Sequence, residues 1–201
     1  DGSIPVAVLD SGLDPGAGLS SVVSAGWDAV DPDRVLSDPA GHGTQMAYLA
    51  SGLLAAEGLS ASDNTLALVA IRAFDENGVT SNFAILQALA YAARAGARVV
   101  NMSWGSETDS DFMRTAMQKA ADRGLTLVAA AGNAPTGNPV YPAAYSTVVA
   151  VGGVTADGQP WANSNHGDFV DLSASASASF PVGNDGPAGA YVGTSISSAV
   201  V

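Results

Sequence analysis

The stretch LALVAIRAFDENGVTSNFAILQALAYAARAGARVVNM, residues 66–102, decides the fold. It opens with an apolar run over residues 66–74 and closes with another over 97–102. Short runs of this kind are typical of strands that are buried on both faces. Between them, residues 82–94 repeat apolar side chains at helical spacing, and Gly96 follows, where a helix end favours a residue that tolerates positive φ. The stretch therefore predicts a strand, a helix and a second strand.

The same alternation continues in both directions along the chain. Further apolar runs predict strands at residues 4–9, 125–130 and 147–151. Helical spacing predicts a second helix from Asp109 to Arg123. We expect each helix to bury one apolar face, made of Phe83, Leu86, Leu89 and Ala90 in the first helix and of Phe112, Ala116, Met117 and Ala120 in the second. Strands that alternate with helices predict the α/β class, here a three-layer α/β/α fold around a mostly parallel central sheet.

Composition fits a single domain over residues 1–201. Hydrophobic residues make up 47% of the 201 residues, and a chain of this length buries roughly 70% of its unfolded surface. No disulfide or metal is therefore needed to hold a core. The stretch of serine and alanine at residues 173–179 is low in complexity, and we expect it to be a loop without chemistry.

Charge and cysteine content exclude several classes of function. Lys and Arg number 7 against 19 Asp and Glu, a net charge of −12, whereas proteins that bind phosphate backbones carry a basic surface. We therefore expect neither nucleic acid nor a membrane surface as a partner. The chain has no cysteine, which excludes thiolate catalysis and cysteine zinc sites. No apolar run approaches the roughly 20 residues of a membrane span.

Chemistry is expected where the strands end, because ligands of parallel sheets bind beside the carboxyl ends of the strands. Three glycine-flanked motifs hold the candidate residues: VLDSG at 8–12, GHGT at 41–44 and GTSISSA at 193–199. Each motif also has an ordinary structural interpretation. Asp10 would serve as a turn residue, His42 as a structural histidine and Ser195 as a helix N-cap.

Taken together, the three motifs indicate nucleophilic catalysis. A serine hydroxyl is a poor nucleophile until a neutral imidazole takes its proton, and a carboxylate must orient that imidazole. The chain order Asp10, His42, Ser195 is one of the orders in which this triad occurs. A nucleotide-binding domain is excluded, because the first strand leads into Asp-Ser-Gly and not into a glycine-rich phosphate loop.

At this point the sequence resembles the subtilisin-like serine protease family. The motifs that carry the resemblance run in family order over essentially the whole chain: VAVLDSG (6–12), GHGTQMA (41–47), VVNMSWGS (99–106), LVAAAGN (127–133), YPAAYSTVVAVGG (141–153) and GTSISSA (193–199). The resemblance implies Asp10 as the orienting carboxylate, His42 as general base and then acid, and Ser195 as nucleophile. It also implies that Asn133 and the backbone N–H of Ser195 form the oxyanion hole.

Two further segments are implied to bind substrate. They are expected to wall the pocket for the P1 residue, whose carbonyl is attacked: Ser103, Trp104 and Gly105 on one side, and Ala130, Ala131 and Gly132 on the other. Val140 stands where many relatives have glycine, at the base of this pocket. We expect medium or large apolar P1 residues. His166 is assigned no chemistry.

The sequence also departs from the family. Relatives continue for several tens of residues past the nucleophile, whereas Ser195 to Val201 allows only about 10 Å of helix. We expect that the C-terminal part is missing, and a trimmed chain, a natural short variant and a fragment completed by another chain all remain open. No leader sequence is evident before residue 4.

A metal is not required for the chemistry. Relatives often bind calcium near the helix after the catalytic histidine, where this chain offers only Glu57, Asp63 and Asn64. A second acidic group is expected to be a solvated loop: Asp28, Asp31, Asp33 and Asp38.

The leading hypothesis is a secreted serine endopeptidase that acts on polypeptides. It needs no cofactor, although structural calcium stays open, and a propeptide or a complementing chain segment is a possible partner. The alternative is an inactive or incomplete relative that binds peptides or a partner chain.

Overall fold

The computed structural model describes residues 4–61 and 64–201, so that Asp63, one of the candidate calcium ligands, lies outside the described residues. Its centre is a seven-stranded sheet in the order β2-β3-β1-β4-β5-β6-β7, and every neighbouring pair is parallel. The strands are β1 (Val6–Asp10), β2 (Val23–Asp28), β3 (Leu68–Arg72), β4 (Val99–Met102), β5 (Thr126–Ala130), β6 (Val148–Val154) and β7 (Leu172–Ser175). The predicted parallel α/β sheet is therefore confirmed.

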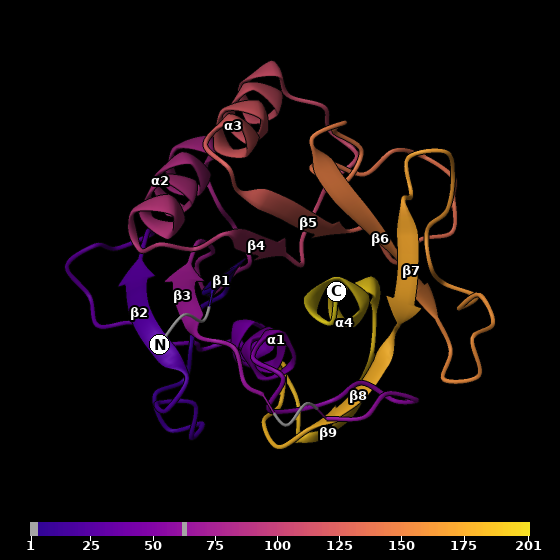
Figure 1. Ribbon diagram of the computed structural model, residues 1–201, viewed down its shortest axis with the longest axis horizontal. Helices are drawn as coiled ribbons and strands as arrows, with labels where there is room; N and C mark the ends of the chain where they lie inside the picture. Colours follow the sequence, from indigo (N-terminus) through magenta and orange to yellow (C-terminus); the bar gives the residue numbers. More distant parts are fainter. Residues whose placement is uncertain (1–3, 62–63) are drawn as a thin grey trace.

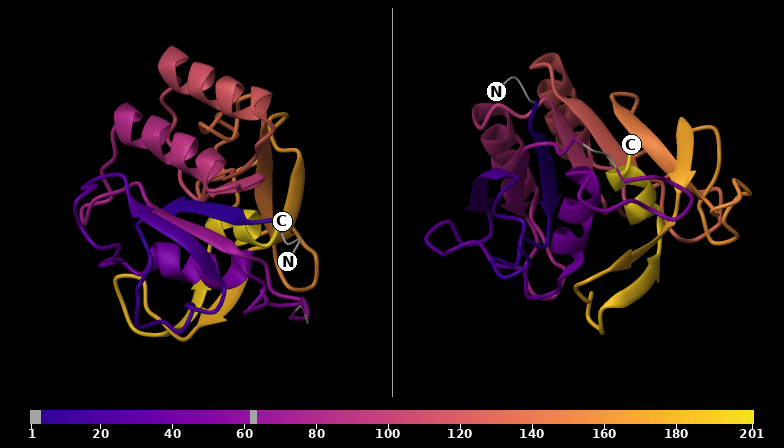
Figure 2. Two further views of the ribbon diagram at one scale, coloured as in Figure 1. Left: turned by 60° about the vertical axis from the view of Figure 1, so that its left-hand side comes forward. Right: turned by 60° about the horizontal axis from the view of Figure 1, so that its bottom comes forward.

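Helices cover both faces of this sheet (Figures 1 and 2). One face carries α2 (Asn82–Arg94) and α3 (Asp111–Asp122), which lie side by side. The other face carries α1 (His42–Ala50) and the short α4 (Thr194–Ala199), which also contact each other. A small antiparallel hairpin of β8 (Ser177–Phe180) and β9 (Gly189–Val192) leads into α4. The result is the three-layer arrangement that the alternation of elements predicted.

The buried face of α2 differs from the predicted one. Phe83 is 65% exposed and Leu86 is 37% exposed, although Leu89 is buried as expected. The side chains that pack toward the sheet are Ala84, Ile85, Ala88, Leu89 and Ala92. Residues 83–92 are apolar on nearly every side of the helix. The spacing of apolar residues alone therefore did not show which side faces the sheet. Small alanines let the helix approach the sheet closely, and this packing decides which face is buried.

In α3 the prediction was largely correct. Ala116, Met117 and Ala120 are buried, whereas Phe112 at the start of the helix is 46% exposed. The hydroxyl of Ser110 accepts a hydrogen bond from the backbone N–H of Met113 and so caps the helix.

Two stretches that the sequence did not predict as strands belong to sheets. Residues 23–28 form the edge strand β2, although Gly26 and Asp28 interrupt any apolar run. Residues 173–179 were expected to be a loop, but all of them except Ala176 lie in β7 and β8. Ser and Ala have no strong strand preference, and these strands form because β6 and β9 supply hydrogen-bonding partners.

The strand ends place the candidate residues at one edge of the sheet. β1 ends at Asp10, which is in register with Arg72 at the end of β3. β4 ends directly before Ser103, and β5 ends directly before Ala131. Within the described residues, no helix is long and apolar enough to span a membrane.

Candidate active site

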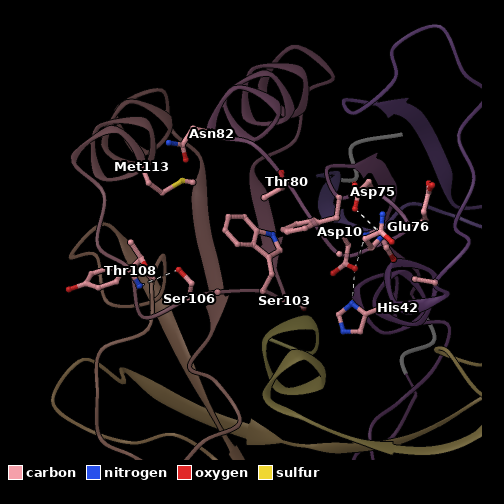
Figure 3. A pocket seen from close by; sticks show the side chains of 18 of the residues that line it. Asp10, His42, Asp75, Glu76, Thr80, Asn82, Ser103, Ser106, Thr108 and Met113 are labelled. Carbon is pink, nitrogen blue, oxygen red and sulfur yellow. Dashed lines mark hydrogen bonds and ion pairs between the residues drawn. The ribbon is translucent and has the colours of Figure 1, made fainter.

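Asp10 and His42 meet at the carboxyl edge of the sheet. Asp10 is the last residue of β1 and His42 the first residue of α1. His42 Nδ1 lies 2.6 Å from Asp10 Oδ1, and the same carboxylate oxygen accepts the backbone N–H of Ser11 at 2.8 Å. Figure 3 shows this contact, with one ring nitrogen of His42 facing the Asp10 carboxylate. Asp10 is buried, whereas the side chain of His42 is 25% exposed. Because Nδ1 faces the carboxylate, Nε2 is left to exchange a proton with a nucleophile.

Glycines on both sides of His42 let two other backbone segments lie close to the start of α1. A Cβ atom at Gly43 would lie 2.4 Å from the carbonyl oxygen of Gly12, and one at Gly41 would lie 2.0 Å from that of Gly183. Gly41 also has a φ of 88°, which side chains disfavour. A side chain at either position would therefore collide with the backbone of another segment.

Asp38 connects the segment that follows Asp10 to the segment that begins at His42. Its Oδ1 accepts hydrogen bonds from the hydroxyl of Ser11 at 2.7 Å and from the backbone N–H of Gly41 at 2.9 Å. Its Oδ2 accepts from the backbone N–H and the hydroxyl of Thr44, at 2.7 and 2.6 Å. One carboxylate therefore joins the residue after Asp10 to the first turn of the helix that begins at His42.

The acidic group around Asp38 is not the solvated loop that the sequence suggested. Asp28 is buried and accepts a hydrogen bond from Arg72 Nη1 at 2.8 Å, and the side chain of Arg72 is also buried. Asp31 and Asp33 fit the expectation: Asp33 is exposed, and the side chain of Asp31 is 49% exposed beside Arg34. Arg72, at the end of the buried strand β3, was the sequence signal for a buried ion pair. Its partner Asp28 lies 44 residues away in the chain, so the sequence did not identify the pair.

The environment raises the pKa of His42 above its ordinary value of 6.5. Burial by itself disfavours the imidazolium and lowers the pKa. The attraction and hydrogen bond of the Asp10 carboxylate outweigh burial, with smaller contributions from Asp38 and Asp185. A higher pKa makes the neutral imidazole a better proton acceptor, which suits a general base.

Ser195 lies in the first turn of α4, where Gly193 is the N-cap. Its hydroxyl donates to the backbone carbonyl of Ser103 at 3.1 Å, and within the described residues no hydrogen bond joins it to His42. Ser103 in turn lines the same cleft as Asp10 and His42. The structure thus brings Asp10 and His42 into contact and links Ser195 to their cleft through Ser103.

The side chain of Ser103 also holds the first turn of α4. Its hydroxyl donates to the backbone carbonyl of Ser195 at 3.1 Å and lies 3.0 Å from the hydroxyl of Ser198. It accepts from the side-chain amide of Asn101 at 2.8 Å. Sequence reasoning placed Ser103 in a substrate-binding wall and missed this contact with α4, because the partners lie more than 90 residues apart.

Asn133 is oriented by Thr194, the residue before the candidate nucleophile. Its Oδ1 accepts the backbone N–H and the hydroxyl of Thr194, both at 2.9 Å. Two donors on one atom identify that atom as the oxygen and leave Nδ2 as the free donor group. A Cβ atom at Gly193 would lie 3.5 Å from Nδ2, so the amide stands beside the start of α4. An amide donor at this place can stabilise negative charge next to Ser195.

A cleft of about 970 Å³ extends from His42 toward α3. Phe74, Trp104 and Met113 form its apolar part, and Figure 3 shows Met113 on the far side of the cleft from His42. The ring of Trp104 packs on Phe74 with centroids 5.4 Å apart, and its Nε1 donates to the carbonyl of Leu9 at 2.9 Å. Trp104 is therefore fixed to β1 and lines the cleft with Ser103 and Gly105.

The second predicted wall does not line this cleft. Ala130 and Ala131 are buried, and only Gly132 is partly exposed. The backbone N–H of Gly132 donates to the hydroxyl of Thr194 at 3.2 Å. This segment thus supports α4 and presents backbone, not alanine side chains, to the site.

Of the three candidate calcium ligands, the structure describes Glu57 and Asn64. Glu57 accepts a hydrogen bond from Ser177 at 2.8 Å. Across residues 4–61 and 64–201, no group of three or more acidic or histidine side chains is placed to hold a metal ion.

Comparison with known proteins gives relatives along the whole chain. Residues 1–201 match the model of the subtilase family. The chain is 36% identical to the minor extracellular protease Epr of Bacillus subtilis (strain 168), over 86% of this chain and 26% of that protein. It is 32% identical to thermitase of Thermoactinomyces vulgaris, over 86% of this chain and 62% of that protein. The chain therefore spans less than two thirds of the length of these curated relatives.

Solved structures share the fold. A lanthipeptide protease superposes with a TM-score of 0.79 at 26% identity, over 98% of this chain and 71% of that one. A cold adapted subtilisin-like serine proteinase gives a TM-score of 0.77 at 25% identity, with the same coverage. Since the family model matches from the first residue to the last and the fold recurs in these proteases, the chain belongs to the subtilase family.

Proposed function

We propose that this chain is the catalytic domain of a serine endopeptidase that cleaves peptide bonds through an acyl-enzyme on Ser195. The observation that carries the proposal is the 2.6 Å contact between Asp10 Oδ1 and His42 Nδ1, two residues that line the cleft. Ser103 also lines this cleft, and its backbone carbonyl accepts the hydrogen bond of the Ser195 hydroxyl. Membership in a family that contains serine proteases supports it.

In the first half of the reaction, His42 Nε2 takes the proton of the Ser195 hydroxyl as the oxygen attacks the substrate carbonyl. The C–O bond forms and the carbonyl π electrons move to the oxygen, which Asn133 Nδ2 and the backbone N–H of Ser195 stabilise. His42 then gives its proton to the leaving amine as the C–N bond breaks. Asp10 stays ionised and stabilises the imidazolium.

The second half repeats these steps with water. His42 takes a proton from a water molecule, whose oxygen attacks the acyl carbonyl. The ester bond to Ser195 breaks, the proton returns to its oxygen, and the carboxylic acid leaves. No step in this cycle requires a metal ion or an organic cofactor.

Polypeptides are the proposed substrates. The backbone of Ser103 to Gly105 runs along the cleft, where an extended peptide can lie beside it and form main-chain hydrogen bonds. An enzyme that recognises the main chain of its substrate can accept substrates of many amino-acid sequences. Residues from His42 to Met113 line the cleft, and several residues of the substrate are proposed to lie along it.

A second candidate function is a peptide-binding domain without catalysis. The hydrogen bond of Ser195 to Ser103, instead of to His42, favours it. In free enzymes, however, catalytic hydrogen bonds are often long or misaligned and form only with substrate bound. The two functions therefore differ in what Ser195 does when a reactive group enters the cleft.

We also propose an extracytoplasmic location, supported by a relative whose name describes an extracellular protease. The net charge of −12 supports the absence of nucleic acid and anionic membrane surfaces among its partners. A propeptide or a complementing chain segment remains a proposed partner.

A fluorophosphonate probe tests the proposal. Intact-mass analysis is expected to show one adduct on the chain and none on Ser195→Ala. Circular dichroism checks that both proteins are folded. A folded chain that takes no adduct would instead identify the domain as a non-catalytic peptide binder.

A further inference from the structure

The turn between β3 and α2 contains Asn77 and Gly78, the only Asn-Gly pair in the 201 residues. Both residues are exposed, and both line the same cleft as His42. In such a pair, the backbone nitrogen of the second residue can attack the carbonyl carbon of the asparagine side chain. Glycine favours this reaction, because it has no Cβ atom to hinder the attack and reaches the required backbone angles easily.

The main chain at Gly78 is open on the side where a side chain would stand. A Cβ atom there would have no atom of a non-adjacent residue within 4 Å, and φ is 70°. The N–H of Gly78 donates to the carbonyl of Asp75 at 3.1 Å, a hydrogen bond inside the same turn. Exposed turns open locally at a small cost in free energy. The nitrogen of Gly78 is therefore available for reaction whenever this contact opens.

The carboxylate of Asp75 holds Asn77 in the turn. Its Oδ1 accepts the backbone N–H of Asn77 at 2.9 Å and that of Val79 at 2.8 Å. The side chain of Asn77 also forms a hydrogen bond with this carboxylate. These contacts depend on the spacing of the main chain in the turn and on a neutral amide at position 77. A chemical change at Asn77 thus alters a turn that borders the cleft.

Other asparagines are less suited to the same reaction. Asn101 and Asn165 are each 2% exposed. Asn138 precedes Pro139, whose nitrogen carries no hydrogen and cannot act as the nucleophile. Asn184 is followed by an aspartate, whose side chain hinders the attack. Each of these asparagines lacks one of the two features that Asn77 combines, exposure and a glycine as the next residue.

We propose that Asn77 is a site of spontaneous deamidation in the wall of the cleft. The nitrogen of Gly78 loses its proton and forms a bond with Cγ of Asn77, which closes a succinimide ring. The C–N bond of the side-chain amide breaks, and the nitrogen leaves as ammonia with the proton from Gly78. Water then adds to one of the two ring carbonyls and opens the ring, which yields aspartate or isoaspartate. Water is the only co-reactant.

Both products change the cleft. Either one adds a carboxylate next to Asp75 and Glu76, which line the same cleft, and makes the net charge of −12 more negative by one. Isoaspartate also inserts one carbon into the main chain between residues 77 and 78. The carboxylate of Asp75 then loses the spacing that lets it accept the N–H groups of both Asn77 and Val79.

The test uses the Ser195→Ala chain, in which the proposed nucleophile cannot cleave the protein during incubation. Deamidation needs no peptidase activity, so failure of the proposed function leaves this inference intact. After incubation in mildly alkaline buffer, the tryptic peptide of residues 73–94 should gain the mass of one amide-to-acid conversion at Asn77. Isoaspartyl methyltransferase should transfer a labelled methyl group to this peptide. The rate should rise by about tenfold for each unit of pH, because the attacking nitrogen must first lose its proton.

Two variants should lose most of the methyl label on this peptide. Asn77→Gln keeps the amide but requires a larger ring, and Gly78→Ala places a methyl group beside the attacking nitrogen. Gly18→Ala is the matched control, because Gly18 is also exposed, has a φ of 76° and faces open space. It should be labelled like the parent chain. Circular dichroism checks that each variant is folded.

A synthetic peptide of residues 73–94 shows how fast the reaction runs without the fold. If the folded chain keeps Asn77 intact while this peptide deamidates, the turn protects Asn77 and the proposal is overturned. Undiminished label in Asn77→Gln would also overturn it, because the reaction would then take place at Asn82, the other asparagine of the peptide.

Discussion

His42 and Ser195 are held in place by two different kinds of contact. The half of the site with Asp10 and His42 is braced by charged groups, above all by the Asp38 carboxylate and its four hydrogen bonds. The half with Ser195 is held by neutral contacts, in which Ser103 and Asn133 bond to the first turn of α4. Charge-assisted hydrogen bonds are roughly twice as strong as neutral ones.

This difference determines how each half of the site, the first with Asp10 and His42 and the second with Ser195, should respond to substitutions and to pH. Carboxylates around His42 set its proton affinity, so that the first half should be sensitive to pH and to charge substitutions. Ser195 lies on a helix of six residues, which is too short to be stable without tertiary contacts. The second half should therefore respond to the loss of individual packing and hydrogen-bonding partners.

The largest effect should come from Ser195→Ala, which removes the hydroxyl of the proposed nucleophile. We expect kcat to fall by about 10⁶-fold, the magnitude known for loss of the nucleophile in subtilisin. His42→Ala should cost about as much, and the double variant little more, because the two residues act as one unit. Peptide hydrolysis under saturating substrate measures this. If the loss of kcat in the double variant equals the sum of the two single losses in free energy, Ser195 and His42 work independently.

The next largest effect should be on stability, at the buried ion pair beside the first half. Arg72→Met leaves Asp28 as an unpaired buried charge, and we expect the free energy of unfolding to fall by about 3–5 kcal/mol. Urea denaturation measures the change. The exposed pair of Arg34 and Asp31 supplies the control, since Arg34→Met should cost about 1 kcal/mol or less. Equal losses in both variants would contradict a special role for burial.

Asn133→Ala tests the neutral contacts of the second half. We expect kcat to fall by about 10²–10³-fold with little change in KM, because in the proposed mechanism the amide of Asn133 donates to charge that develops only in the transition state. Thr194→Val removes the hydroxyl that orients this amide but keeps the backbone N–H. The kcat of this variant should therefore fall by about tenfold or less. An Asn133→Ala variant with unchanged kcat and raised KM would instead assign Asn133 to ground-state binding.

The smallest effect on rate is expected for Asp38→Asn, which removes a charge from the first half. The carboxylate helps to raise the pKa of His42, so its removal should lower that pKa. Activity requires the neutral imidazole, and kcat/KM therefore rises with pH through this pKa. In the variant, the acid limb of the profile should move to lower pH.

Asp33→Asn is the control for Asp38→Asn, because Asp33 is exposed and lies in the same loop. Its pH profile of kcat/KM should match that of the parent chain. An acid limb that does not move in Asp38→Asn would show that Asp38 braces the backbone without setting the proton affinity of His42.

Much of the site could be predicted because it lies in short motifs. Asp10 at the end of a buried apolar run and His42 between two glycines were found from local sequence, and the structure brings them together. The role of Asp38 was missed, although it lies only four residues before His42. Its partners are distributed over Ser11, Gly41 and Thr44, and a carboxylate in a loop has no local signal that separates a brace from a solvated charge.

The sequence by itself determined the fold class and the family, because the periods of strand and helix and the glycine-flanked motifs are local properties of the chain. Only the tertiary structure decided which face of α2 is buried, that residues 173–175 and 177–179 lie in strands, and that Val140 lies between Gly105 and Gly132. These features depend on contacts between residues far apart in the chain. Their energies arise from packing and hydrogen bonds that exist only once the sheet has formed.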